Sequence, residues 1–192
     1  MPPPVRQRIL AAAEDLFYSQ GIASTGVDAV IERAGVATGS LYKHFGGKDA
    51  LVEAYLHDRD LRWRAHWQAC IDAEVDPVER VLAIFTATAT WSPDAPADRG
   101  CAHLAAMVQL PGGHPARRAA VAHKQHLADR LEELCAETSA HDPGDLSRDV
   151  LLVYEGMNNQ LALGADPEAI ERARRMARSR LTAQERGGPI EC

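Results

Sequence analysis

The sequence contains no apolar run that approaches the roughly 18 residues needed to cross a membrane, and its N-terminus lacks the basic-then-apolar pattern of a secretion signal. Both absences predict a cytoplasmic protein without a membrane partner. Cysteine is scarce as well, because the four cysteines lie far apart and form no Cys-x-x-Cys pair. This spacing argues against a disulfide framework and against a zinc ribbon, so reduced and mostly buried thiols are expected.

Catalytic motifs are also missing. An enzyme built on a helical bundle would need a Glu-x-x-His pair or His-Glu-x-x-His, and neither occurs. There is no Gly-x-Ser-x-Gly elbow and no dinucleotide fingerprint. Gly47 and Lys48 do not end a phosphate loop, because Asp49 stands where such a loop requires Ser or Thr. We therefore expect no enzyme, no catalytic residue and no cofactor.

The formal net charge of −6 is distributed unevenly along the chain. Residues 1–64 hold eight Lys/Arg and eight Asp/Glu, whereas residues 65–192 hold 13 Lys/Arg and 19 Asp/Glu. The first part can therefore meet a polyanion without a repulsive net charge. A sequence-blind DNA-packaging protein would be strongly basic overall, so DNA binding by this chain would have to rely on a specific docked geometry.

Proline and glycine divide the chain into helix-length pieces, and no strand-like alternation persists, which predicts an all-α fold of about nine helices. The expected long helices are Val5–Gln20, Lys48 to about Cys70, Pro77–Trp91, Cys101–Leu110, Pro115–Ala140, Gly144–Gly164 and Pro167–Leu181, with a loop at Trp91–Gly100. Thr25 and Asp28 have the spacing of a capping box before a short helix that ends at Arg33.

The segment Thr38–His44 would be only about 10 Å long as a helix, which is too short to be stable alone in water. Leu41 and Phe45 are four residues apart and can both point inward, with Val36 anchoring the preceding turn. The opposite face then carries Gly39, Ser40 and Lys43, with Tyr42 and His44 at its flanks.

Such a face suits the major groove of DNA. The first turn of the helix offers backbone amides to phosphate, and Gly39 lets the backbone approach closely. Ser40 and Lys43 can reach base edges, Tyr42 can bond a phosphate oxygen, and Lys48 adds a cation at the start of the next helix. The preceding short helix and its glycine turn complete a helix-turn-helix. The alternative is a helical hairpin in a larger bundle, with a solvated polar face.

The run AGVATGSLYKHF, with Arg6–Phe17 before it and Lys48–Leu51 after it, resembles the N-terminal domain of the TetR family of bacterial transcriptional repressors. The resemblance covers Arg6 to Val52. It implies close backbone approach at Gly39 and DNA contacts from Thr25, Thr38, Ser40, Tyr42, Lys43, His44 and Lys48. Two residues depart from the family pattern. Ala37 replaces a common capping Ser or Thr, which leaves this helix weakly capped, and Thr38 replaces a frequent basic residue.

By the same resemblance, the chain divides into a DNA-binding domain (1–47), a ligand-binding and dimerisation domain (48–183) and a disordered tail (184–192). The two C-terminal helices have apolar stripes wider than one neighbouring helix could cover. Paired with a second copy, they would form a four-helix bundle across a two-fold axis. The expected dimer residues are Leu146, Val150, Val153, Met157, Leu161, Ile170, Ala173, Ala177 and Leu181. The alternative is a purely intramolecular core.

A homodimer would place two copies of the Thr38–His44 helix, the recognition helices, roughly 34–36 Å apart. The predicted partner is therefore double-stranded DNA with a near-palindromic operator. A small-molecule inducer of unknown identity would act by shifting the population of DNA-competent dimers. The candidate pocket residues, whose composition equally suits a core, are Trp67, Phe85, Trp91, His103, Met107, His126, Tyr154 and Asn158.

The eight histidines also raise the question of a metal site. His123 and His126 are three residues apart on one expected helix, with His103 and His114 upstream. No Cys or carboxylate stands at a diagnostic spacing beside them, so no metal site is predicted. Nothing in the sequence marks a thiol as activated for redox sensing.

Overall fold

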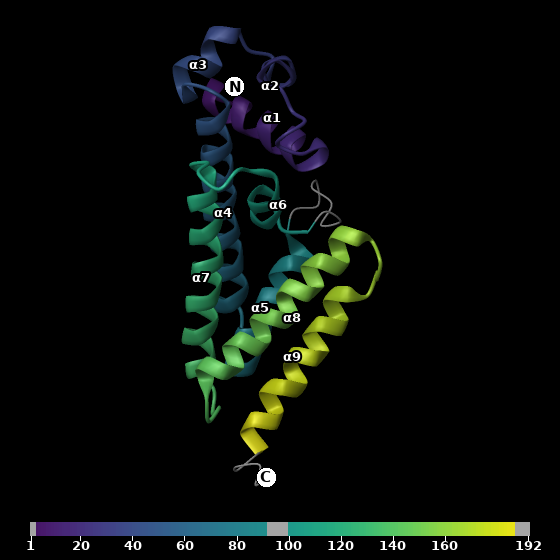
Figure 1. The fold of residues 1–192 in the computed structure, drawn as a ribbon. Helices are drawn as coiled ribbons and strands as arrows, with labels where there is room; N and C mark the ends of the chain where they lie inside the picture. Colours follow the sequence, from purple (N-terminus) through teal and green to yellow (C-terminus); the bar gives the residue numbers. More distant parts are fainter. Residues whose placement is uncertain (1–2, 92–99, 187–192) are drawn as a thin grey trace. The chain divides into compact units, whose positions relative to one another are not determined.

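The computed structural model describes residues 3–91 and 100–186, which form nine α-helices and no strand (Figure 1). The helices are α1 (Val5–Gln20), α2 (Val27–Ala34), α3 (Thr38–Phe45), α4 (Lys48–Asp72), α5 (Pro77–Thr90), α6 (Ala102–Gln109), α7 (Ala116–Ala136), α8 (Pro143–Leu163) and α9 (Ala169–Arg186). The predicted all-α fold is confirmed. Within the described ranges, no helix is both long enough and apolar enough to cross a membrane.

The largest differences from the predicted helices are at the C-terminal ends. Helix α7 stops at Ala136 rather than Ala140, and α9 continues to Arg186. Residues 184–186 are therefore helical instead of belonging to the predicted tail. The rest of that tail and most of the expected loop at Trp91–Gly100 lie outside the described residues.

The chain forms two compact units, which do not coincide with the predicted boundary after residue 47. Unit 1 comprises Met1–Arg62 and Cys101–His123, and unit 2 comprises Trp63–Gly100 and Lys124–Cys192. The reason is that α4 begins as part of the first core, since Leu51 and Val52 are fully buried there.

In unit 1, helices α1, α2 and α3 pack against one another. Ile9, Val30 and Leu41, one from each of these helices, are fully buried in a shared core. Two glycines in the left-handed conformation end the short helices, Gly35 after α2 with φ 60° and Gly46 after α3 with φ 78°. Few other residues adopt this conformation readily, so both glycines fix the angles at which the chain leaves these helices.

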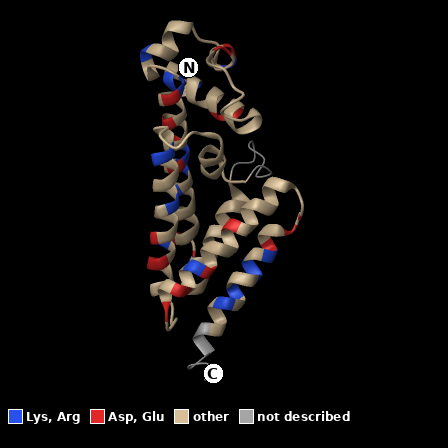
Figure 2. Ribbon diagram, viewed as in Figure 1, with Lys and Arg blue, Asp and Glu red and all other residues tan. Residues whose placement is uncertain are grey.

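Unit 2 has a largely apolar core. Its helix α5 buries most of the residues from Val78 to Thr88, and α8 and α9 run side by side (Figure 1). Figure 2 shows basic residues, all of them Arg, recurring along α9. Two of these, Arg174 and Arg178, donate to Glu79 of α5, the former at 3.0 Å. Ion pairs thus flank the apolar contact between α5 and α9.

Candidate functional site

Helix α3 presents the face that its sequence predicts. Leu41 is fully buried, and Phe45 and Val36 are partly buried against the core of unit 1. Tyr42 is 50% exposed. The other exposed residues of this helix are Thr38, Gly39, Lys43 and His44, and Ser40 is half-buried. The apolar anchors therefore leave a polar face directed away from the core.

The N-terminus of α3 has no side-chain cap. Ala37 occupies the capping position with extended backbone, and it offers no side-chain acceptor to the first amides. This agrees with the weak capping predicted from its sequence. Uncapped amides at a helix N-terminus form a positive end that suits a phosphate oxygen.

Gly39 has no structural requirement for glycine within the fold. A Cβ built on it would meet no other atom within 4 Å, whereas a Cβ on Gly35 would lie 2.9 Å from Nη2 of Arg8. Gly35 also has a positive φ, and Gly39 does not. Packing within the described part of the chain therefore does not explain the bare backbone at Gly39.

Arg8 is a positioning residue that the sequence reasoning missed. Its Nη2 donates to the carbonyl oxygens of Ala34 and Gly35, each at 2.6 Å, and so fastens α1 to the turn between α2 and α3. Nearby, the guanidinium of Arg6 lies 5.4 Å from the centre of the Phe45 ring. Both arginines hold α1 against the helix-turn-helix. Their role depends on tertiary proximity, for which the sequence gives no spacing signal.

The side chain of Thr25 is buried within unit 1. It is 1% exposed, and its hydroxyl donates to the carbonyl oxygens of Gly21 at 2.8 Å and Leu16 at 3.3 Å. The predicted capping box is wrong, because Gly26 occupies the capping position of α2 and no side chain caps it. Thr25 is therefore placed to fix the turn between α1 and α2.

The cations near α3 differ in their availability. Arg33 of α2 pairs with Asp15 of α1 at 2.5 Å. By contrast, neither Lys43 nor Lys48 forms an ion pair with any residue that the structure describes. Lys43 is exposed and Lys48 is half-buried, so both ammonium groups remain available to an external anion.

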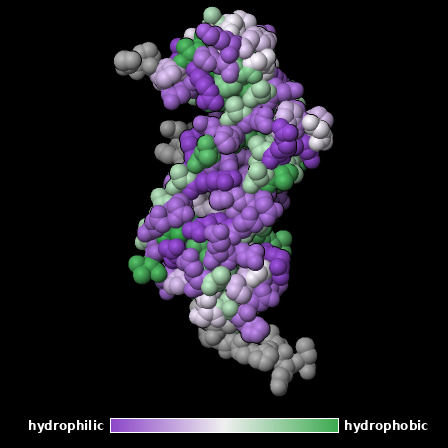
Figure 3. Space-filling model, turned by 90° about the vertical axis from the view of Figure 1, so that its left-hand side faces the viewer, coloured by the Kyte–Doolittle hydropathy of each residue, from purple (hydrophilic) through white to green (hydrophobic). Residues whose placement is uncertain are grey.

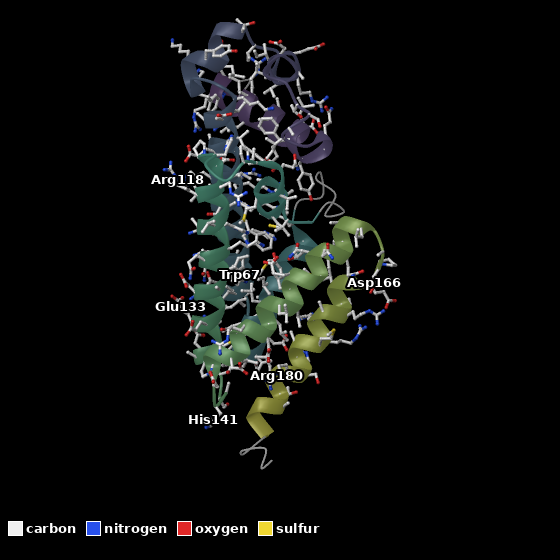
Figure 4. All side chains as sticks on the ribbon, viewed as in Figure 1. Trp67, Arg118, Glu133, His141, Asp166 and Arg180 are labelled. Carbon is white, nitrogen blue, oxygen red and sulfur yellow. The ribbon has the colours of Figure 1, made fainter. Side chains whose placement is uncertain are left out.

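The candidate pocket residues separate between the two units. Six belong to unit 2, namely Trp67, Phe85, Trp91, His126, Tyr154 and Asn158. Trp67 of α4 is 1% exposed, and Figure 4 shows Glu133 pointing outward from α7. The indole nitrogens of Trp63 and Trp67 are buried and find no hydrogen-bond partner among the described residues. Unpaired buried donors are rare in proteins, so these two groups mark a place where an acceptor could bind.

His103 and Met107 lie on α6 in unit 1 instead. His103 is 3% exposed and stacks on His123 of α7, with ring centres 3.9 Å apart. Burial lowers the pKa of His103. Burial opposes protonation of His123 too, but hydrogen bonds with Asp60 and Cys101 outweigh it and raise the pKa of His123. His126, three residues further along α7, packs against Trp67 in unit 2 instead.

Most residues expected at a dimer interface lie in the core of unit 2. Those with at most 5% exposure are Leu146, Val150, Met157, Ala173, Ala177 and Leu181. Val153, Leu161 and Ile170 are partly buried against the same core. The prediction assigned these side chains to a second copy, yet α8, α9 and the rest of unit 2 already cover most of their surface.

Different apolar side chains remain exposed on the two C-terminal helices. Leu152 and Leu163 of α8 are 73% and 68% exposed, and Met176 of α9 is 57% exposed.

On the face of the molecule drawn in Figure 3, hydrophilic residues predominate and hydrophobic ones form separate small spots. That face therefore offers no broad apolar surface to a partner.

Two family descriptions match the chain. Residues 9–55 match "Bacterial regulatory proteins, tetR family", and residues 77–177 match "Tetracyclin repressor-like, C-terminal domain". The regulator LmrA of Bacillus subtilis is 38% identical over 81 residues, which are 42% of this chain and 43% of LmrA. The repressor KstR2 of Mycolicibacterium smegmatis is 33% identical over 84 residues, 43% of this chain and 40% of KstR2. The matched part spans less than half of these curated relatives.

Solved structures match over nearly the whole length. SCO4454, a TetR-family transcriptional regulator from Streptomyces coelicolor, is 31% identical with a TM-score of 0.85, covering 94% of this chain and 95% of that one. The sav143 protein from Streptomyces avermitilis is 30% identical with a TM-score of 0.80, covering 95% and 99%. The similarity therefore includes both units of the fold.

Proposed function

Because this chain belongs to the TetR family of bacterial regulatory proteins, a family of transcriptional regulators and not of enzymes, we propose that it represses transcription as a homodimer on a near-palindromic operator. A small molecule bound in unit 2 releases it from DNA. In this proposal, the protein binds DNA through α3 and the start of α4.

One observation carries the DNA-binding assignment. Gly39 stands at the start of an exposed helix, in open space, where the fold itself would tolerate a side chain. Thr38, Ser40, Tyr42, Lys43 and His44 share its helix, and Lys48 follows at the start of α4. A phosphate or base edge that approaches Gly39 closely meets uncapped amides and unpaired ammonium groups. Thr25 acts indirectly in this proposal, by fixing the turn that leads into α2.

The substitution Gly39→Ala tests the assignment. Folding stability should stay the same or rise by up to about 1 kcal/mol, because alanine favours a helix and meets no neighbour. Binding to a duplex selected by this protein from a random pool should weaken by roughly 1–3 kcal/mol, the size of one good base contact. Thermal unfolding and fluorescence anisotropy measure the two effects separately.

Gly113→Ala serves as the matched control, because Gly113 also lies in unit 1 and a Cβ there would meet no atom within 4 Å. This variant should bind the selected duplex as the parent does. Unchanged DNA affinity in Gly39→Ala would mean that nothing approaches that backbone, and the assignment of α3 would be abandoned.

Dimerisation is proposed to use the apolar side chains that unit 2 leaves exposed. Leu152 and Leu163 are eleven residues apart, so they lie on almost the same line along α8. Met176 lies on α9, which packs beside α8. In an isologous contact between two copies, each of these side chains would occur twice, once from each copy.

Leu152→Glu should therefore shift the protein towards a monomer, as measured by sedimentation equilibrium over a range of concentrations. Val75→Glu is the control, because Val75 is 95% exposed and lies between α4 and α5. A dimer that forms equally well in both variants would place the interface elsewhere. A monomer with undiminished affinity for a palindromic duplex would contradict the homodimeric mode of binding.

The ligand is proposed to be an apolar or aromatic molecule that carries a hydrogen-bond acceptor. The aromatic side chains of Trp63, Trp91, Phe85 and Tyr154 meet edge to face in two pairs within the core of unit 2. The unpaired indole N–H groups of Trp63 and Trp67 supply the donors that an acceptor would satisfy. Ligand binding would favour dimers whose recognition helices no longer match the spacing of the groove.

A further inference from the structure

Three side chains of types that can bind metal ions lie together inside unit 1. Cys101 is the N-terminal capping residue of α6, His103 lies in the first turn of that helix, and His123 comes from α7. One ligand atom from each residue lies within 4.8 Å of the other two. His103 and His123 are 3% and 4% exposed, and Cys101 is half-buried. No segment of the sequence shows this set, because His123 is 22 residues from Cys101.

The outer nitrogen of each histidine is already held. Nε2 of His103 donates to the carbonyl oxygen of Leu56 at 3.0 Å. Nδ1 of His123 donates to Oδ1 of Asp60 at 2.6 Å. In the neutral ring, each histidine therefore carries its proton on that held nitrogen and its lone pair on the other one, Nδ1 of His103 and Nε2 of His123. A carboxylate or carbonyl that accepts from the far nitrogen is the usual second shell of a metal-binding histidine.

The chemistry of the three groups defines the class of ion. The thiol of Cys101 lies within hydrogen-bonding reach of both imidazoles. One sulfur and two imidazole nitrogens form a borderline-soft donor set, which Mg²⁺ and Ca²⁺ avoid and Zn²⁺ prefers. The sulfur and nitrogens need to approach to roughly 3.3–3.8 Å from one another around a tetrahedral ion with bonds of about 2.0–2.3 Å. The two rings, stacked with an interplanar angle of 10°, must tilt apart to achieve this.

We propose that Cys101, His103 and His123 bind one Zn²⁺-class ion, with Asp60 and the Leu56 carbonyl as positioning groups. Binding converts the thiol to a thiolate and releases its proton to solvent as the sulfur–metal bond forms. Three protein ligands leave the fourth tetrahedral position to water or to a small external ligand.

The position of the cluster links it to the helix-turn-helix within the same unit. Helix α6 carries two of the ligands at its first turn, and its last residue is Gln109. The side-chain oxygen of Gln109 accepts from the amides of Ile22 at 2.9 Å and Ala23 at 3.4 Å, in the turn between α1 and α2. Asp60 and Leu56 belong to α4, which begins directly after α3. Closing the cluster therefore moves both α4 and α6 against the DNA-binding helices, and this regulatory step rests on the proposed function.

The site is tested by adding Co²⁺, a spectroscopic substitute for Zn²⁺, to the full-length reduced protein without DNA. One equivalent per chain should produce a thiolate-to-cobalt charge-transfer band in the near ultraviolet, and Zn²⁺ should abolish it by competition. Cys101→Ser and His123→Gln should each remove the band. Asp60→Asn should keep the band but weaken affinity by about 10–100-fold, the usual effect of losing a second-shell group.

Matched controls come from unit 2, where Cys70 and His66 are also half-buried. Cys70→Ser and His66→Gln should bind Co²⁺ as the parent does. Circular dichroism identifies any variant that fails to fold. If Cys101→Ser fails to fold, the weakened Co²⁺ affinity of Asp60→Asn still tests the site. No stoichiometric binding by the folded parent, or an unchanged band in folded Cys101→Ser, would overturn the site.

The regulatory step has its own readout. Zn²⁺ should change the affinity of the parent for its selected duplex by at least about fivefold, the lower end of typical allosteric coupling, and should leave Cys101→Ser unaffected. Metal binding without any change in DNA affinity would retain the site and reject its regulatory role. If the parent binds Co²⁺ but selects no duplex, the proposed function fails while the metal site stands.

Discussion

The two units bury polar side chains in different ways. In unit 2, Thr88 donates to the carbonyl of Ile84, Ser147 to that of Gly144 and Asn158 to that of Tyr154. Each of these bonds stays inside one helix. In unit 1, buried Thr25 also bonds locally, but the other buried polar side chains connect different helices: His123 of α7 bonds to Asp60 of α4, and His103 of α6 bonds to the Leu56 carbonyl of α4. Buried Arg59 of α4 likewise pairs with the part-buried Glu14 of α1.

The difference has a physical consequence for each unit. A bond within one helix satisfies its donor without constraining how that helix packs, so the helices of unit 2 are positioned mainly by apolar contact and by ion pairs at its edge. A buried bond between helices is lost if either helix shifts, which makes the arrangement in unit 1 specific. The helices of unit 1 are therefore positioned by polar bonds as well as by their apolar core, whereas those of unit 2 depend mainly on apolar packing.

The largest expected effect is at the buried pair of unit 1. His123→Ala should lower the free energy of unfolding by about 3 kcal/mol, because the carboxylate of Asp60, with 8% of its side chain exposed, loses its imidazole partner. Asn158→Ala in unit 2 should cost only about 1 kcal/mol, because it removes one bond within α8. Urea denaturation followed by circular dichroism measures both. Equal losses of unfolding free energy in the two variants would contradict the proposed difference between the units.

An intermediate effect is expected at Arg8. Arg8→Met removes two charge-assisted bonds to the carbonyls of Ala34 and Gly35, and it should destabilise the protein by about 1.5–3 kcal/mol. Arg148→Met is the control in unit 2, since Arg148 is 71% exposed and pairs with Asp145 one turn away in α8. That change should cost less than about 0.5 kcal/mol. If Arg8→Met and Arg148→Met lose the same unfolding free energy within experimental error, the turn between α2 and α3 does not depend on α1.

The smallest effect concerns pH and the edge of unit 2. Hydrogen bonds from Arg178, followed by the charges of Arg178 and Arg174, hold the pKa of Glu79 below its ordinary value of 4.5 even though burial acts in the opposite direction. Asp76 is the other carboxylate that acts on Arg178. A lowered pKa in the folded state means that the stabilisation is complete above pH 4.5 and is lost as the pH falls through the folded pKa.

The variant Glu79→Gln isolates this contribution. Its deficit in unfolding free energy should be below about 1 kcal/mol near neutral pH, as for other solvent-accessible ion pairs, and should shrink towards zero in acid. The difference between parent and variant, measured at a series of pH values, reports Glu79 alone because all other carboxylates are shared. A deficit that grows in acid would contradict the assigned direction of the pKa shift.

The sequence predicts the fold and the exposed face of α3 well, because both depend on short-range patterns. Leu41 and Phe45 lie one turn apart between glycines, so their inward direction follows from helix geometry alone. The capping-box prediction for Thr25 is wrong for an equally local reason. Its hydroxyl follows the C-terminus of α1, where unsatisfied carbonyls compete with the amides of α2, and it bonds to those carbonyls.

The remaining parts depend on which helix covers which face. A stripe such as Val150, Met157 and Leu146 shows that α8 has an apolar side, but not whether the same chain or a second copy covers it. Likewise, no spacing rule connects Cys101 with His123, since the two residues meet only after α6 and α7 have packed. The spacing of apolar residues shows which side of a helix is apolar, but only the tertiary fold shows which helix packs against that side.

The chain passes from one unit to the other three times, after Arg62, Gly100 and His123. Neither unit is therefore encoded by a single uninterrupted stretch of the gene. A chimera that exchanges only residues 1–47 with a relative would combine a foreign helix-turn-helix with the native Leu51, Val52 and Leu56, whose side chains complete its core. Transplanting DNA specificity between such regulators therefore requires exchanging the start of α4 and residues 101–123 together with the recognition helix.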